Sequence, residues 1–156
     1  MFYGGKLLSN LSLEDENELI NLMNVNRNAI IVLDSDKKNA STPLNKTKKR
    51  IISEASKNGI LIWVTKGREI ENYIPEDLIK KYYEKETSRK IFGQYQNIEE
   101  YIESLKKNEG NKFLRNKTEF ANNILKLASY EKFKDVYDLK KMVSKTLIEI
   151  YSWNKN

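Results

Sequence analysis

The stretch from Ala29 to Asp36 constrains the fold of this chain more than any other. Five apolar residues, 29–33, lead directly into two aspartates, Asp34 and Asp36. A short apolar run rich in β-branched residues predicts a strand that is buried on both faces, as in a parallel sheet. Ligands of open α/β sheets bind at the carboxyl ends of the strands, and two close carboxylates repel unless a cation lies between them. The pair therefore predicts a hard divalent cation, with a solvated loop as the simpler alternative.

A second apolar strand is expected at residues 60–65, after the turn residues Asn58 and Gly59. Between the two strands, Thr42 and Pro43 offer an N-cap and a first helical position for a helix that extends to about residue 57. A strand, a helix and a strand in this order predict a right-handed βαβ unit with parallel strands.

The rest of the chain is expected to be mainly helical. Ser12 with Asp15, Asn97 with Glu100, and Asn116 with Glu119 have the spacing of helix-capping pairs. Apolar residues over 139–151 recur at the spacing of a core-facing helix, and residues 84–97 are the expected long loop. The sequence thus predicts an α/β core over residues 1–83 and a helical region over 84–156 that packs on it as one structural unit.

Composition excludes several kinds of chemistry. The chain has neither cysteine nor histidine, which excludes disulfides, thiolate zinc sites, a histidine base and a Ser-His-Asp triad within this chain. Carboxylates with a hard metal, lysine and hydroxyl nucleophiles remain. Because there is no apolar run of about 18 residues and no signal-peptide pattern, a cytoplasmic protein that does not insert into membranes is expected.

The positive charge of the chain is unevenly distributed. The net charge is +6, and residues 106–156 hold 12 Lys and Arg against 6 Asp and Glu. A second basic cluster follows the aspartate pair and has no acid among residues 37–53. Its members are Lys37, Lys38, Lys46, Lys48, Lys49 and Arg50. Lysines beside a predicted metal site favour a polyanionic, phosphate-bearing substrate, whereas the simpler alternative is a solvated lysine-rich surface.

A second acidic pair, Glu69 and Glu71, follows the second predicted strand. If neighbouring parallel strands bring both pairs to one edge of the sheet, four carboxylates converge. Four carboxylates without histidine are typical of a Mg2+ or Mn2+ site for phosphoryl transfer. The alternative is that the two glutamates pair with Lys66 and Arg68 on a surface loop.

Three segments, Met1–Leu8 (MFYGGKLL), Ile31–Asp36 (IVLDSD) and Trp63–Tyr73 (WVTKGREIENY), together resemble the TOPRIM nuclease domain of OLD-family (overcoming lysogenization defect) proteins. The resemblance is close over residues 1–80 and looser beyond. It implies a TOPRIM, Rossmann-like parallel sheet and a metal-dependent DNA endonuclease. In that family an ABC-type ATPase region precedes the nuclease in the same polypeptide, and many members act in defence against phage.

The resemblance also implies roles for single residues. Asp34 and Asp36 match the metal ligands of the family, and Glu71, with Glu69 two residues before it, matches the acidic position of a second metal site. Lys117 resembles a lysine near a helix start that stabilises the pentacovalent phosphate, although a plain surface lysine is the competing interpretation. Lys117 and Glu69 are thus the candidate catalytic residues, and Arg68 joins the basic cluster as a candidate DNA contact.

One departure from the family pattern concerns the first strand of the sheet. TOPRIM domains begin with a strand that ends in Glu-Gly-x-x-Asp before the Tyr-Gly-Gly segment, and this chain has no such motif. The first strand is therefore expected to be missing from the sheet, and the chain is expected to be the C-terminal part of a larger ATP-dependent nuclease.

Three functions remain open from the sequence. The first is a Mg2+- or Mn2+-dependent endonuclease that acts when the missing N-terminal part complements it. The second is a non-catalytic DNA-binding or assembly module, with self-association left open. The third is a phosphatase of the haloacid-dehalogenase kind, although Lys37 and Lys38 stand where such enzymes have Gly-Thr.

Overall fold

The structure is a computed structural model that describes residues 28–85, 87 and 90–155. Its elements in chain order are β1 (Ile30–Leu33), α3 (Lys46–Lys57), β2 (Leu61–Val64), the 3-10 helix η1 (Ile70–Tyr73), α4 (Glu76–Tyr82), α5 (Ile98–Leu105), α6 (Glu109–Arg115), α7 (Lys117–Leu127), the 3-10 helix η2 (Tyr130–Lys132) and α8 (Leu139–Trp153). The strand expected near Tyr3 and the helix expected from Ser12 lie outside the described residues.

The described residues form two compact units. The first comprises residues 28–33, 44–63 and 146–155, and the second comprises residues 34–43 and 64–145. Each unit is thus formed by segments that are separated in the sequence. The domain boundary expected at residues 83 and 84 stays a prediction.

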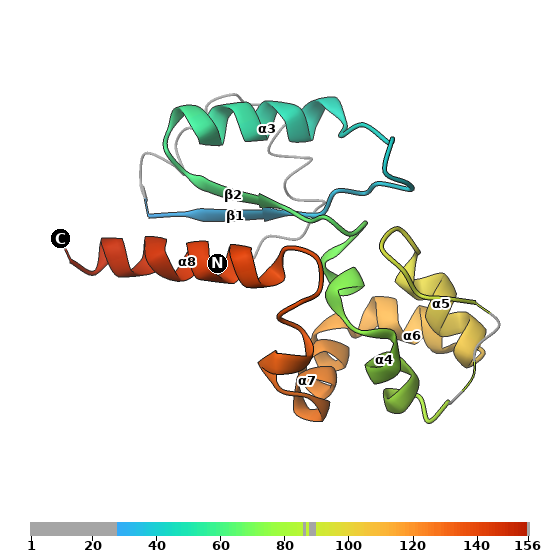
Figure 1. The fold of residues 1–156 in the computed structure, drawn as a ribbon. Coiled ribbons are helices and arrows are strands. Elements are labelled where there is room, and N and C mark those ends of the chain that lie inside the picture. The colour runs from blue at the N-terminus through green and yellow to red at the C-terminus, as the bar shows by residue number, and fades with distance from the viewer. Residues whose placement is uncertain (1–27, 86, 88–89, 156) are drawn as a thin grey trace. The chain divides into compact units, whose positions relative to one another are not determined.

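The first unit contains the expected βαβ arrangement. The strands β1 and β2 form a two-stranded parallel sheet, and α3 lies alongside it (Figure 1). Ile51 and Ala55 of α3 are buried, and the N–H of Ile60 donates to the carbonyl of Ala55 at 2.9 Å, which ties the entry of β2 to the end of the helix. A mixed α/β chain with a parallel strand pair is thus confirmed.

The start of α3 corrects the sequence prediction. The helix begins at Lys46, and its N-cap is Asn45, whose side chain accepts from the N–H of Lys48 at 2.8 Å. The hydroxyl of Thr42, the expected cap, instead donates to Oδ1 of Asn39 at 3.0 Å. Because Asn45 caps the first turn three residues later than expected, Thr42 and Pro43 lie before the helix, and the N–H of Thr42 closes a turn by donating to the carbonyl of Asn39.

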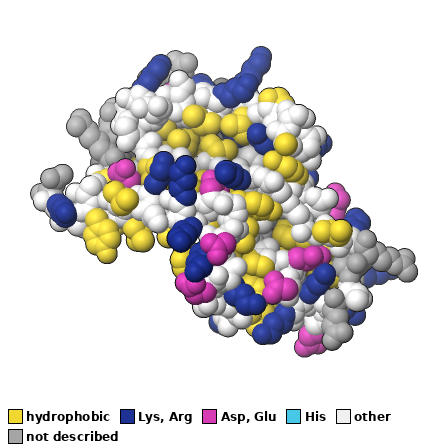
Figure 2. All heavy atoms as spheres, viewed as in Figure 1, with side chains coloured by type: hydrophobic (Ala, Val, Ile, Leu, Met, Phe, Trp, Pro, Cys, Tyr) yellow, Lys and Arg dark blue, Asp and Glu magenta, His cyan; other side chains and the backbone are white. Residues whose placement is uncertain are grey.

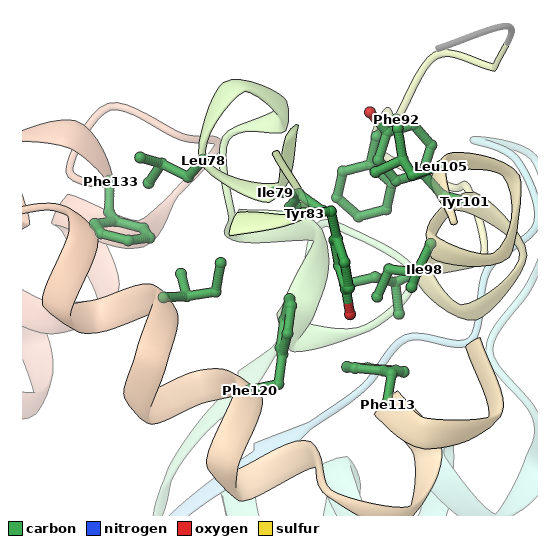
Figure 3. Packing of buried hydrophobic residues seen from close by; sticks show 12 residues of the cluster. Leu78, Ile79, Tyr83, Phe92, Ile98, Tyr101, Leu105, Phe113, Phe120 and Phe133 are labelled. Carbon is green, nitrogen blue, oxygen red and sulfur yellow. The ribbon is translucent and has the colours of Figure 1, made fainter. Parts of the chain in front are cut away.

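The second unit is built around an aromatic core between α4, α5, α6 and α7 (Figure 3). Phe120 of α7 lies edge-on to Phe113 of α6, with ring centroids 5.0 Å apart, and faces Tyr83 at the end of α4. Tyr101 and Ile102 of α5 are almost fully buried. Each such side chain contributes about 1.5–3 kcal/mol through burial, so this core fixes the positions of the four helices.

The helix caps of the second unit were predicted with mixed success. The Asn97 side chain accepts from the N–H of Glu100, so the predicted cap of α5 is confirmed. Asn116 precedes α7 as expected, but its side chain makes no capping hydrogen bond. The reason is that α6 ends at Arg115, and the N–H of Asn116 closes that helix by donating to the carbonyls of Lys112 and Phe113.

Between residues 28 and 155, as far as the structure describes them, no helix has the length and apolar character needed to cross a membrane.

Candidate acidic site

The first acidic loop begins where β1 ends. Asp34 directly follows the strand, and the next residue, Ser35, turns inward and is buried. The Ser35 N–H donates to Oγ1 of Thr65 at 2.9 Å, and the Ser35 hydroxyl donates to the carbonyl of Gly67 at 2.6 Å. On either side of Ser35, Asp34 is half-buried and Asp36 is exposed, and Asp36 adopts a left-handed conformation (φ 53°) that aspartate tolerates.

The second acidic loop follows β2 and is joined directly to the first. The N–H of Ile70 donates to Oδ1 of Asp34 at 2.8 Å, and the N–H of Asp36 donates to the carbonyl of Arg68 at 2.8 Å. The two pairs of carboxylates are therefore delivered to neighbouring loops, as the sequence predicted from parallel strands.

Asn72 fixes the shape of the second loop from within. It is 3% exposed, and its Oδ1 accepts from the N–H of Glu69 at 2.8 Å. Its Nδ2 donates to the carbonyls of Gly93 and Gln96, at 2.9 and 3.0 Å. The close approach also explains Gly67, where an added Cβ would lie 2.6 Å from the Cβ of Asn72. Sequence reasoning missed these positioning residues, since only the glycine carried a signal.

The ammonium of Lys117 contacts the second loop. Lys117 is the first residue of α7, and its Nζ lies 2.8 Å from Oε1 of Glu71 and 3.9 Å from Oε2 of Glu69. The same Nζ lies 5.2 Å from the ring centroid of Phe113, a cation–π contact. The structure thus brings Lys117 to the acidic loops, whereas the alternative pairing of the loop with itself is limited to Arg68 and Glu69 at 3.7 Å.

Charge and burial shift several ionisation equilibria in this cluster. Burial raises the pKa of Asp34, and the charges of Glu71 and Asp36 raise it further, against a backbone amide and Lys117, which lower it. Burial and the charge of Glu71 likewise raise the pKa of Glu69. Burial would lower the pKa of Lys117, but the hydrogen bond to Glu71 and the other carboxylates outweigh it and raise the value. The cluster therefore carries more negative charge than its single lysine neutralises.

The donor set fits a hard cation in part. Oε2 of Glu71 is buried and has no hydrogen-bond partner within the described residues. A buried carboxylate oxygen without a partner is costly unless a cation or water satisfies it. Within residues 28–85, 87 and 90–155, however, no three acidic side chains are gathered closely enough to form a ready metal-binding group. The loops thus supply oxygen ligands of the correct type, while Lys117 holds one of them.

The predicted DNA-contact residues divide between the two units. Lys37, Lys38 and Arg68 belong to the unit that holds the acidic loops, whereas the remaining members, Lys46, Lys48, Lys49 and Arg50, lie on α3 in the other unit. On the face shown in Figure 2, Lys and Arg side chains are interspersed with Asp and Glu rather than joined in one basic field. Arg50 also pairs with Glu54 of the same helix at 3.8 Å.

Comparison of the chain with protein-family models, with curated proteins and with solved structures gave no significant match.

Proposed function

We propose that this chain carries the acidic centre of a TOPRIM-type, metal-dependent DNA endonuclease. The observation that supports this most is the joining of the two acidic loops, in which the N–H of Ile70 donates to Asp34 and the N–H of Asp36 donates to Arg68. Two carboxylate pairs at the ends of parallel strands, next to a lysine, supply the groups that phosphodiester hydrolysis requires. The resemblance to OLD-family nucleases points to the same chemistry.

Each residue of the cluster would have a distinct role. Asp34, Asp36 and Glu71 would hold Mg2+ or Mn2+, because carboxylate oxygens are the ligands that these ions prefer. The bound ion would activate a water molecule and stabilise the leaving oxygen. Lys117 would place a positive charge beside the phosphate, and Glu69 would keep that ammonium oriented. Asn72 and Ser35 would hold the two loops together.

The proposed substrate and partners follow from charge and from the family resemblance. The excess of lysine and arginine favours a polyanion, and DNA is the substrate of the similar nucleases. By the same resemblance, the proposed setting is the cytoplasm, the proposed partner is an ABC-type ATPase region, and the proposed role is in defence against phage.

A non-catalytic DNA-binding or assembly module is the second candidate. It is favoured by the ion pair between Lys117 and Glu71, because that pair already supplies one oxygen of Glu71 with a positive charge and needs no metal. In addition, no three acidic side chains among the described residues lie close enough together to hold a metal ion.

A plasmid-nicking assay with Mg2+ or Mn2+ separates the two candidates. Nicking by the full chain that Asp34→Asn and Glu71→Gln abolish supports the endonuclease. Asp77→Asn is the matched control, because it removes an exposed carboxylate of the same unit outside the acidic loops. Nicking that survives Asp34→Asn, or DNA binding without cleavage under either metal even when an N-terminal ATPase region is supplied in trans, would contradict the endonuclease.

Metal binding can be measured without activity. Titration of Mn2+ into the protein, followed by electron paramagnetic resonance of the free ion, should show binding that Asp34→Asn weakens and Asp77→Asn does not. Equal binding by all three proteins would show that the acidic loops hold no metal.

A further inference from the structure

A shallow polar hollow, open to solvent, lies along α7 and begins at Lys117. It has a volume of about 550 Å3 and is lined by Arg115, Asn116, Lys117, Thr118, Glu119, Asn122, Asn123 and Lys126. All of these residues belong to the unit that holds the acidic loops. Its described lining includes three cationic side chains and three asparagines but one carboxylate, that of Glu119. The hollow is therefore rich in hydrogen-bond donors and carries net positive charge.

Among the residues that the structure describes, no carboxylate neutralises the two outer cations of the hollow, Arg115 and Lys126. Within the described residues, Arg115 makes no ion pair, and the Nζ of Lys126 donates only to Oδ1 of Asn123 at 3.3 Å. Elsewhere in this unit, by contrast, Lys80 is paired with Glu76 at 3.1 Å. Arginine and lysine side chains left with solvent, beside amide donors, are the groups that bind phosphate oxygens.

The length of the hollow matches a stretch of nucleic-acid backbone. From Lys117 to Lys126 the helix rises by about 14 Å, at about 1.5 Å per residue. One strand of duplex DNA places a phosphate about every 3.4 Å along the duplex axis, so a path of this length parallel to that axis passes about four phosphates. At one end of this path, Lys117 contacts Glu71 and Glu69 of the acidic loops.

From these observations we propose that the hollow along α7 binds the phosphate backbone of one DNA strand and directs that strand to the acidic loops. Arg115 and Lys126 make the phosphate contacts, Asn122 and Asn123 donate hydrogen bonds, and Lys117 is shared between the strand and the acidic site. The inference rests on the proposed function, since it names the path by which the substrate of that site is bound. It assigns DNA contacts that the basic cluster of residues 37–50 does not include.

The test measures DNA binding alone, in the presence of EDTA, so that cleavage does not contribute. The affinity of the full chain for a labelled duplex is measured by fluorescence anisotropy at several salt concentrations. In the double variant Arg115→Ala, Lys126→Ala, the binding constant should fall less steeply with salt. The magnitude of the slope of log K against log salt concentration should decrease by about 2, because each lost phosphate contact removes about 0.9. Glu119→Gln should instead tighten binding, since it removes the one carboxylate that lines the hollow among the described residues.

The matched control is the double variant Lys81→Ala, Lys107→Ala, which removes the same charge from exposed positions of the same unit outside the hollow. Its slope should stay within about 0.5 of the unaltered protein. An equal fall in slope for both double variants would overturn the proposal, because bulk charge would then explain binding. An unchanged slope for the hollow variant, or preferential binding of RNA or an acidic peptide, would also overturn it.

The outcome is separable from that of the proposed function. Asp34→Asn should abolish nicking and leave the salt slope unchanged. If nicking depends on Asp34 while the hollow variant binds DNA with an unchanged slope, the further inference fails and the nuclease stands. If the slope falls as expected and no metal supports nicking, the strand-binding path stands and the nuclease fails.

Discussion

Asn72 makes the most specific prediction of the structure, because its replacement should loosen the acidic loop without removing a carboxylate. Its side chain makes three hydrogen bonds, to the N–H of Glu69 and to the carbonyls of Gly93 and Gln96. A hydrogen bond in a protein contributes a net of about 0.5–1.5 kcal/mol. Asn72→Ala should therefore lower the free energy of unfolding by about 2–4 kcal/mol, a large fraction of the about 5–15 kcal/mol of a typical domain.

The comparison with Asn72→Asp identifies which of the three bonds matter. Aspartate keeps an acceptor for the N–H of Glu69 but loses both donors, and it places a charge against two carbonyl oxygens beside the acidic loops. It should therefore destabilise at least as much as alanine. Asn111→Ala, an exposed position on α6, is the control and should change the stability by less than about 0.5 kcal/mol.

Urea denaturation gives the global loss, and amide hydrogen exchange locates it. Exchange should accelerate for residues 66–73 and 92–97, which Asn72 joins, more than for α5 and α6. A loss below about 1 kcal/mol for Asn72→Ala, a milder effect of Asn72→Asp, or uniform acceleration of exchange would refute the role assigned to this side chain.

Three further substitutions test the same unit. Gly67→Ala should destabilise by about 1–3 kcal/mol in thermal unfolding, because its Cβ would lie 2.6 Å from that of Asn72; an unchanged melting temperature contradicts this. Lys117→Met removes the ammonium held by the acidic loop and should raise Mn2+ affinity at least about tenfold by calorimetry, while Lys117→Arg should not. Tyr101→Phe removes a 2.7 Å hydrogen bond to Glu76 and should lower the unfolding free energy by about 1.5–3 kcal/mol at pH 7. Although burial alone would raise it, hydrogen bonds from Tyr101, Lys80 and a backbone amide lower the pKa of Glu76, so this stabilisation is present above pH 4.5 and is lost as pH falls through the lowered pKa. Urea titrations at pH 7 and below pH 4.5 should therefore show a smaller effect of Tyr101→Phe in acid, and an equal effect would refute the assignment.

Local sequence patterns predicted the elements that depend on neighbouring residues. The apolar runs around Ile31 and Ile62 identified the two strands, and the spacing of apolar residues between them identified α3. Such patterns can be recognised within a short window of sequence. Capping was less predictable, since Asn45, Thr42 and Pro43 all carry helix-start chemistry within four positions. Which one caps depends on where the turn closes.

Long-range contacts could not be predicted in the same way. That parallel strands would bring Asp34 near Glu69 follows from topology, and the hydrogen bond from Ile70 to Asp34 bears it out. By contrast, Asn72 bonds to residues 21 and 24 positions away. Asparagine is common in turns and on surfaces. The local pattern therefore does not distinguish a buried asparagine that hydrogen-bonds two segments from one that faces solvent.

Lys117 connects the two proposals physically, because its single ammonium belongs both to the hollow and to the acidic loops. A phosphate that binds in the hollow at Lys117 competes with Glu71 for that ammonium. Glu71, whose second oxygen already has no hydrogen-bond partner within the described residues, would then be left with both oxygens available to a cation. The binding of DNA and of a divalent cation should consequently favour each other by the same factor, since coupling between two sites is reciprocal. In this arrangement the lysine would occupy one oxygen of Glu71 in the absence of substrate, and a bound strand would release that oxygen for a cation.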